Sequence, residues 1–256
     1  MHTFQEATAV HGITLLNNEL YTIHQRDVDD QLQVYSTSDF RLLRRVTVPD
    51  LRGKVVEDMT SCEQKQCIYA SDNANGCVYQ VVLDRSVSRW PVKGRPQGLS
   101  VTRDSNLLVT CCDTLGAHGK LLLLRSDSGE CLEEIVLDPD ILCPWHAVQL
   151  SDRQCIVCHE HDGGGLSRVG ADGKVVGGRN GCGGLSRPRH MAVDNDQSVL
   201  VADEENNQIV LFDSSLNYVF SVMQQMRSKP RHLCYDDVAR RLYVGQDDGV
   251  VSVVQL

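Results

Sequence analysis

The sequence repeats one short apolar phrase six times, and this period constrains the fold more than any other feature. The central aliphatic residues of the phrases are separated by 48, 40, 48, 44 and 42 residues. Each phrase is rich in Leu, Ile and Val and is bounded by turn residues, which is typical of a buried β-strand. Such a period indicates repeated units that bury their apolar faces against their neighbours. The equivalent residues are Leu20, Ile68, Leu108, Ile156, Leu200 and Leu242.

Each unit holds further strand-like segments around this phrase. In the fifth unit they are residues 190–193 before it and 209–212 and 218–222 after it. Turns rich in Asp, Asn or Gly separate the second and third strands, as at residues 72–76, 204–207 and 246–249. Four antiparallel strands per unit, six units and no convincing helix predict an all-β, six-bladed β-propeller of four-stranded antiparallel blades. We expect one domain over residues 1–256. Its blades are predicted at about 9–48, 55–92, 97–137, 145–180, 189–225, and 231–256 plus 1–8.

The last unit lacks a fourth strand, because the chain ends at Leu256 on the third one. Residues 1–8 precede the first unit and have no place within it. We therefore predict that this N-terminal segment supplies the missing strand and closes the ring, which also leaves fewer exposed sheet edges.

Composition excludes some classes of function. No stretch approaches 18 consecutive apolar residues, so neither a transmembrane helix nor a membrane partner is expected. The formal net charge of −9 opposes unspecific attraction to nucleic acids. The 11 cysteines are odd in number, lie mostly in apolar strand patterns and follow no visible secretory signal. We therefore predict free thiols and a cytoplasmic protein.

The fifth unit resembles the NHL repeat. Residues 187–194 read Arg-Pro-Arg-His-Met-Ala-Val-Asp, and residues 199–213 hold a Val-Leu-Val-Ala-Asp strand, an Asn-containing turn and an apolar strand that ends in Phe-Asp. The sixth unit is a good second match, whereas the others match mainly in spacing. The chain looks most like the NHL propeller at the C-terminus of tripartite-motif (TRIM-NHL) ubiquitin ligases.

This resemblance implies a recognition domain. Nothing in the sequence resembles a RING finger, a B-box or a coiled coil, so ligase activity does not carry over. NHL propellers of that group bind protein partners or RNA. Related six-bladed propellers include lactonases and the peptidyl-hydroxyglycine amidating lyase.

Basic residues gather in the turns that join one blade to the next, and these turns lie on one face of the disc. Together with Trp145 we expect them to form a ligand-binding face. Acidic residues of the neighbouring turns share that face, and this mixed charge favours a protein or peptide partner over RNA, which stays an alternative. The predicted residues are Arg52, Lys54, Lys93, Arg95, Trp145, Arg187, Arg189, Lys229 and Arg231.

Three histidines and one aspartate occupy equivalent positions at the start of the first strand of their blades, at the channel rim: Asp58, His146, His190 and His232. Three converging imidazoles could bind zinc. In the resembling lyase, however, each histidine directly follows the proline, whereas here one residue intervenes. A shift of one residue turns a side chain to the other face of a strand. We therefore predict no metal and no cofactor, and histidines that hydrogen-bond a neighbouring blade.

No catalytic constellation recurs at comparable positions. Residues 155–159 match a haem-attachment motif, but the repeat assigns them to a strand, which places the two cysteines on opposite faces. Our prediction is a non-catalytic, monomeric recognition module that binds a protein or peptide and is no enzyme. RNA binding through the basic turns is the alternative, and a channel-metal lyase or lactonase-like enzyme is the second.

Overall fold

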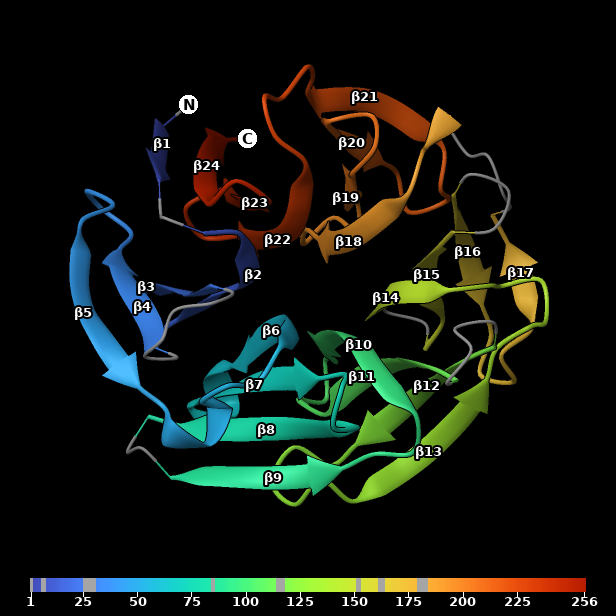
Figure 1. Cartoon of the computed structure of the whole chain (residues 1–256). Helices are drawn as coiled ribbons and strands as arrows, with labels where there is room; N and C mark the ends of the chain where they lie inside the picture. Colours follow the sequence, from blue (N-terminus) through green and yellow to red (C-terminus); the bar gives the residue numbers. More distant parts are fainter. Residues whose placement is uncertain are drawn as a thin grey trace.

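Six four-stranded antiparallel sheets surround a central axis in the computed structural model (Figure 1). The structure describes residues 2–5, 8–24, 31–83, 86–113, 118–150, 153–160, 164–178 and 184–256. Within these residues two single turns of 3-10 helix, η1 (Pro49–Leu51) and η2 (Glu63–Lys65), accompany the strands. The prediction of an all-β, six-bladed propeller is confirmed.

The first three blades follow one another along the chain, each with its innermost strand first. They are β2 (Val10–Leu16), β3 (Glu19–His24), β4 (Gln31–Ser36) and β5 (Leu42–Thr47); β6 (Val56–Cys62), β7 (Cys67–Asp72), β8 (Cys77–Val82) and β9 (Val87–Pro91); and β10 (Arg95–Val101), β11 (Leu107–Cys112), β12 (Gly119–Leu124) and β13 (Cys131–Val136).

The last three blades continue this order. They are β14 (Pro144–Gln149), β15 (Cys155–His159), β16 (Gly165–Val169) and β17 (Val175–Gly177); β18 (Pro188–Val193), β19 (Val199–Asp203), β20 (Gln208–Phe212) and β21 (Tyr218–Met223); and β22 (Pro230–Asp236), β23 (Arg241–Gln246), β24 (Val250–Gln255) and β1 (His2–Gln5).

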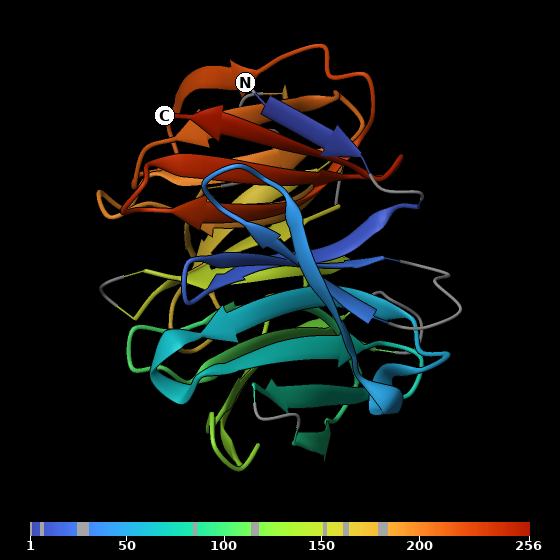
Figure 2. The ribbon, with the colours of Figure 1, turned by 90° about the vertical axis from the view of Figure 1, so that its left-hand side faces the viewer.

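Strand β1 closes the ring. It pairs antiparallel with β24, with His2 opposite Val253 and Gln5 opposite Val250. Figure 2 shows this N-terminal strand beside the C-terminal one at the outer edge of the sixth blade. The predicted closure by the N-terminal segment is confirmed, and it ties both chain ends into one sheet.

The apolar core lies between neighbouring blades. The second strands β7, β11 and β19 are buried along their whole length, whereas the outer strands β5 and β13 are mostly exposed. One core cluster joins Tyr21 and Val34 of the first blade to Ile68 and Tyr79 of the second. Each second strand faces a neighbouring blade on both sides, so both of its faces are buried. This explains why the short apolar segment recurs in every unit of the sequence.

We expect Phe4→Ala to weaken this closure. Phe4 is half-buried and packs against Tyr35, with 4.7 Å between the ring centroids. Loss of this contact should lower the free energy of unfolding by ~2 kcal/mol. Denaturant unfolding measures the effect. The exposed neighbour Gln5→Ala is the control, and an equal loss in both variants would contradict a role for the Phe4 contact.

Candidate active site

A β-bulge recurs near the start of every innermost strand, and it shapes the end of the channel. In each blade the pairing with the second strand shifts register at the same place, so that at least one residue is left out of the ladder. A bulge re-aims the side chains beside it. The shifts lie between Val10 and Gly12, Val56 and Asp58, Pro96 and Leu99, Pro144 and His146, Pro188 and His190, and Pro230 and His232.

Two consecutive residues of each blade therefore face the axis, and they form two rings. The upper ring, which lines a pocket on one face of the disc, is His11, Glu57, Gln97, Trp145, Arg189 and Arg231. The lower ring is the next residue in each blade, namely Gly12, Asp58, Gly98, His146, His190 and His232.

The two glycines of the lower ring make room for its larger members. A Cβ atom on Gly98 would lie 2.7 Å from the His146 ring, and one on Gly12 would lie 2.5 Å from the Cβ of Met59. A side chain at either position would displace a neighbouring blade. Small residues in two blades thus let the charged and aromatic groups of the other four pack across the axis.

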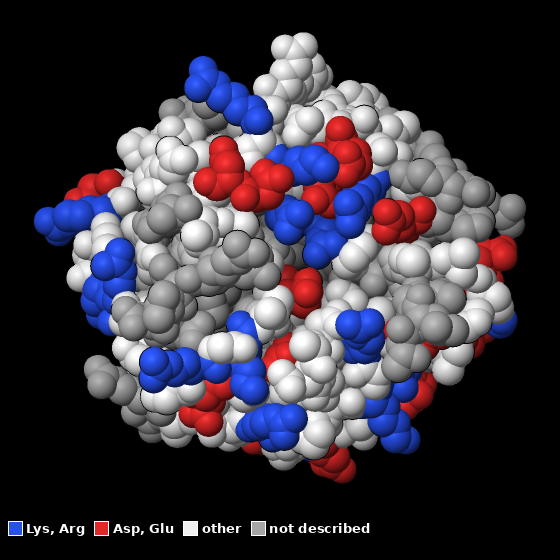
Figure 3. All heavy atoms as spheres, in the orientation of Figure 1, with Lys and Arg blue, Asp and Glu red and all other residues white. Residues whose placement is uncertain are grey.

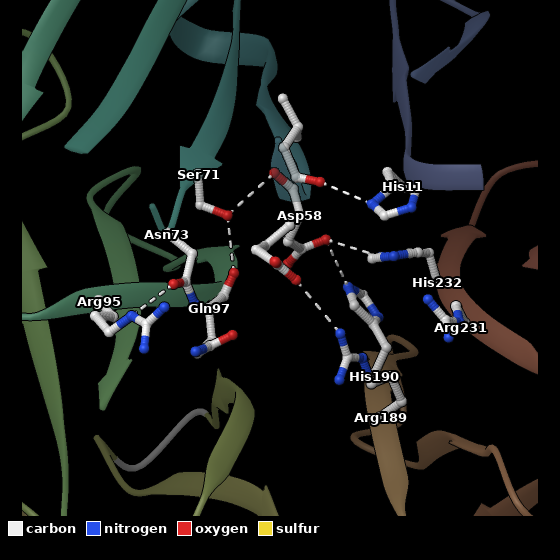
Figure 4. A network of polar contacts seen from close by, with 12 residues as sticks. His11, Asp58, Ser71, Asn73, Arg95, Gln97, Arg189, His190, Arg231 and His232 are labelled. Atoms are coloured by element: carbon white, nitrogen blue, oxygen red, sulfur yellow. Dashed lines mark hydrogen bonds and ion pairs between the residues drawn. The ribbon is translucent and has the colours of Figure 1, made fainter. Parts of the chain in front are cut away.

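The carboxylate of Asp58 lies at the centre of the lower ring and is only 2% exposed. Its Oδ1 atom lies 3.2 Å from His232 Nδ1 and 3.3 Å from His190 Nε2 (Figure 4). The backbone N–H groups of Met59 and Leu99 donate to its two oxygens at 2.8 and 2.7 Å. Asp58 therefore accepts donors from four different blades.

The three histidines stack around this carboxylate. The rings of His146 and His190 are stacked with centroids 3.9 Å apart, and His190 meets His232 edge-on at 5.4 Å. The Nε2 atom of His146 donates to the carbonyl oxygen of Leu99 at 3.0 Å and lies 3.8 Å from Asp58. The predicted hydrogen bonds between a channel histidine and a neighbouring blade are thus present.

Burial sets the charges of this cluster. It lowers the pKa of His146 to about 3 and that of His232 to about 4, against the opposing attraction of Asp58. Burial alone would raise the pKa of Asp58, but His190, His232 and the two backbone N–H groups hold it well below its usual range. At neutral pH the cluster holds the Asp58 carboxylate beside the neutral imidazoles of His146 and His232.

One ligand atom from each of three residues, Asp58, His190 and His232, lies within 4.8 Å of the other two. Their hydrogen bonds decide whether these atoms are free to bind a metal ion. The backbone N–H of Leu233 donates to His190 Nδ1 at 3.3 Å, which puts the ring proton on Nε2, the atom that faces Asp58. A protonated nitrogen cannot bind a metal, and the Asp58 oxygens already accept four donors. The arrangement does not fit a cation.

Above the cluster lies a pocket of about 530 Å³, which is the size of a small-molecule site. The Arg189 guanidinium stacks 3.7 Å from the centre of the Trp145 ring and pairs with Glu57 at 3.4 Å. Figure 3 shows the hollow near the axis, with Lys and Arg side chains gathered beside it over β18 and β22.

A cavity of about 10 Å³, bounded by Glu57, His232 and others, lies between pocket and cluster and has room for about one water molecule.

Two arginines of the pocket share one buried carboxylate. Glu204 is 1% exposed, and its oxygens lie 3.3 Å from Arg187 Nε and 3.3 Å from Arg231 Nη2. Arg187 also approaches the half-exposed Glu160 and Glu205, at 3.6 and 3.5 Å. The arginines are therefore held in place from behind, on the side away from the pocket.

The structure brings part of the predicted face together. Arg95, Trp145, Arg187, Arg189 and Arg231 line the pocket. The remaining predicted residues do not line it, and Lys229 pairs with Glu205 at 2.7 Å at the rim; these residues are Arg52, Lys54, Lys93 and Lys229. The basic turns thus form a compact pocket wall instead of one continuous surface.

Sequence reasoning missed His11, Glu57 and Gln97, which complete the upper ring. The sequence did contain a signal for them, because each directly precedes the residue of its blade that is equivalent to the rim histidines. Glu204 belongs to one of the acidic turns expected on this face, but its burial between two arginines depends on contacts between blades.

We expect the stability of the fold to fall as the pH drops below about 6.5. His146 and His232 have lower pKa values in the folded chain than the ordinary 6.5, so the unfolded chain binds more protons between pH 6.5 and about 4. Protonation of Asp58 extends the loss below pH 4. Melting temperatures from pH 7.5 to 4 measure it. His146→Gln should show a shallower decline, and a constant melting temperature between pH 7 and 5 would refute the assignment.

We expect the cluster to hold no stoichiometric zinc. After zinc loading and dialysis, elemental analysis should give far less than one zinc per chain, and Asp58→Ala should give the same value, because the His190 proton faces the site. Thiols elsewhere can bind traces of zinc, so the comparison with this variant is the control. One zinc per chain that Asp58→Ala abolishes would contradict the hydrogen-bond argument.

Comparison with known proteins gives the fold but no family. Neither a protein-family model nor a curated protein matches the sequence. Similar solved structures include virginiamycin B lyase from Staphylococcus aureus, with a TM-score of 0.65 and 12% identity over 100% of this chain and 88% of the lyase chain. A gluconolactonase from Xanthomonas campestris has a TM-score of 0.75 and 14% identity over 98% of this chain and 87% of its own.

These comparisons overturn the prediction of a non-catalytic module that binds a protein or peptide and is no enzyme. The structures named above are a lyase and a lactonase, and one face of the disc holds an open pocket over a buried carboxylate and imidazoles. No helix in the described part of the chain is long and apolar enough to cross a membrane. At 12–14% identity the likeness establishes the architecture, a six-bladed propeller similar to those of lyase and gluconolactonase enzymes.

Proposed function

We propose that the chain is a lactonase-type propeller enzyme, with the arginine-lined pocket as its active site and Asp58 and His232 as its base. The observation that carries the proposal is a buried carboxylate–imidazole pair beneath a pocket of small-molecule size. Opening a lactone requires removal of a proton from water and stabilisation of an oxyanion. The residues of this site offer both.

His232 is the base. Its Nδ1–H donates to Asp58 at 3.2 Å, which leaves Nε2 as the nitrogen with a lone pair. A pKa of about 4 keeps the imidazole unprotonated at neutral pH, and the Asp58 carboxylate stabilises the cation that forms when a proton arrives. His190 cannot share this role, because its Nδ1 accepts the Leu233 N–H.

The small cavity supports a hydrolytic reaction. His232 lines it together with Glu57 and Arg189, and its volume of about 10 Å³ suits one water molecule between base and pocket. That water loses a proton to His232 and attacks the carbonyl carbon of a substrate in the pocket. When the tetrahedral intermediate collapses, the ring C–O bond breaks and the protonated His232 returns its proton to the leaving alkoxide oxygen. The guanidinium of Arg189, fixed between Trp145 and Glu57, lies beside the cavity and stabilises the oxyanion.

Two of the similar solved structures support a catalytic role for this pocket. Besides the gluconolactonase, a histidine-to-alanine variant of virginiamycin B lyase with quinupristin is described as catalytically inactive, with a TM-score of 0.68 and 12% identity over 99% of this chain and 87% of its own. A histidine is therefore required in that enzyme. In this chain the corresponding chemistry is proposed for His232.

Two finer expectations belong to the same proposal. The NHL-like pattern of the fifth blade supports a common origin with NHL propellers. In this chain the same fold would hold the proposed catalytic pocket. The free thiols of the ten described cysteines support a reducing, cytoplasmic location.

The proposal is tested with the purified chain and a panel of γ- and δ-lactones and cyclic depsipeptides, with mass spectrometry of the products. Hydrolysis adds the mass of one water, whereas lyase chemistry opens the ring without a change in mass. We expect hydrolysis, and a loss of about 10²-fold or more in kcat for His232→Ala, because a general base is removed. Thermal melts and circular dichroism show whether the variant is folded.

The exposed histidine His118, which does not line the pocket, provides a matched control, and His118→Ala should retain full activity. Ring opening without added mass would replace the lactonase by a lyase. Absence of any product with the whole panel, or a folded His232→Ala variant with unchanged kcat, would refute the proposed base.

A further inference from the structure

The wall of the pocket formed by the fifth and sixth blades carries an excess of positive charge. Arg187, Arg189 and Arg231 line it, and Arg95 of the third blade lines the same pocket. Glu57 is the single acidic residue that lines the pocket among those described. Glu204 adds one carboxylate behind the wall. Half-exposed carboxylates at the rim are screened by solvent and compensate the arginines weakly.

Several donors of this wall lack partners. Within the described residues, the buried Nε atom of Arg231 and the buried Nε1 atom of Trp145 have no hydrogen-bond acceptor. Arg187 Nε lies 3.3 Å from Glu204 but makes no well-aligned hydrogen bond with it. A buried donor without an acceptor costs about 1–3 kcal/mol. Glu204 therefore leaves part of the positive charge of this wall uncompensated.

The arginines are also fixed before any ligand arrives. Glu204 holds Arg187 and Arg231 from behind, and Arg189 is stacked on Trp145 and paired with Glu57. Fixed guanidinium groups lose little entropy on binding, and their planar donors match the two oxygens of a carboxylate or phosphate. The Trp145 ring adds an apolar plane beside these donors.

We infer that the substrate is a small molecule with a carboxylate or phosphate group, which the guanidinium groups of Arg187 and Arg231 bind at this wall. This inference rests on the proposed function for the position of the reacting carbonyl, which faces the His232 side of the pocket. The anion fixes one end of the substrate on the fifth and sixth blades. The other end is then directed toward the small cavity above the cluster.

Direct binding tests the inference without catalysis. Trp90 and Trp145 are the two tryptophans of the chain, so the Trp90→Phe variant leaves Trp145 as the sole indole reporter. We expect benzoate or phenyl phosphate to change its fluorescence saturably and benzamide and benzyl alcohol to leave it unchanged. The anion that binds more tightly shows whether the pocket prefers a carboxylate or a phosphate group. Calorimetry on the unmodified chain repeats the titration in case Trp90→Phe does not fold.

Arg231→Gln is expected to weaken binding of the anion about tenfold or more, because a charge-assisted hydrogen bond is lost. Arg52→Gln, which removes an exposed arginine outside the pocket, is the matched control and should bind as the parent does. No saturable binding of either anion, equal binding by folded Arg231→Gln, or equal binding of benzamide would overturn the inference. Tight binding of single-stranded RNA that excludes both small anions would do so as well.

The outcomes separate the two proposals. Anion binding that Arg231→Gln weakens, in a chain that opens no lactone, would retain this inference and refute the proposed function. Hydrolysis of neutral lactones that neither benzoate nor phenyl phosphate inhibits would retain the function and refute the anionic substrate.

Discussion

One buried carboxylate organises the centre of this propeller. An ionised group out of contact with water is stable only when donors surround it, and Asp58 obtains them from its own blade and from the third, fifth and sixth. The blades bearing these donors must approach the axis closely and in a fixed order. The ring of sheets and the cluster at its centre therefore support each other, because the blade packing positions the donors and the carboxylate holds the blades together.

The same cluster divides the channel into two unlike parts. On one side lies the arginine-lined pocket with Trp145 and Glu57. On the other lies a cavity of about 290 Å³ whose wall mixes polar and apolar surface and includes Met59, Leu99 and Val148. His190 borders both the small cavity above and this lower one. Since the imidazoles and the carboxylate fill the axis, the substrate of the proposed reaction would enter and leave by the polar side.

The fold was largely predictable from the sequence, because the repeat period reports a contact that every unit makes. Leu20 and its five equivalents lie in strands enclosed by two neighbouring blades, so the apolar phrase had to recur. The strand from the N-terminus could be predicted because the sixth unit lacked one. The meeting of Asp58 with His190 and His232 followed from their equivalent positions, and the structure brings all three to the axis.

The polar face was less predictable, because it depends on departures from regular strand geometry. Alternation along a regular strand would turn Glu57 away from the side that Asp58 faces, but the bulge lets both face the channel end. Glu204 looked like an exposed turn residue, since its two arginine partners come from other strands and a neighbouring blade. Contacts of this kind cannot be predicted from a local sequence pattern, and because of them part of the expected docking surface is the wall of a pocket.

The sixfold bulge also affects how such a pocket can change over evolution. Each blade contributes one residue to the wall and the following residue to the floor, so the two layers are encoded at adjacent codons but face different surroundings. A substitution at Gln97 or His11 alters what the wall recognises, while Asp58 and its donors, which belong to the floor, keep their contacts. The residues of the wall can therefore change one at a time while the carboxylate and histidines of the floor, the proposed acid–base groups, keep their contacts.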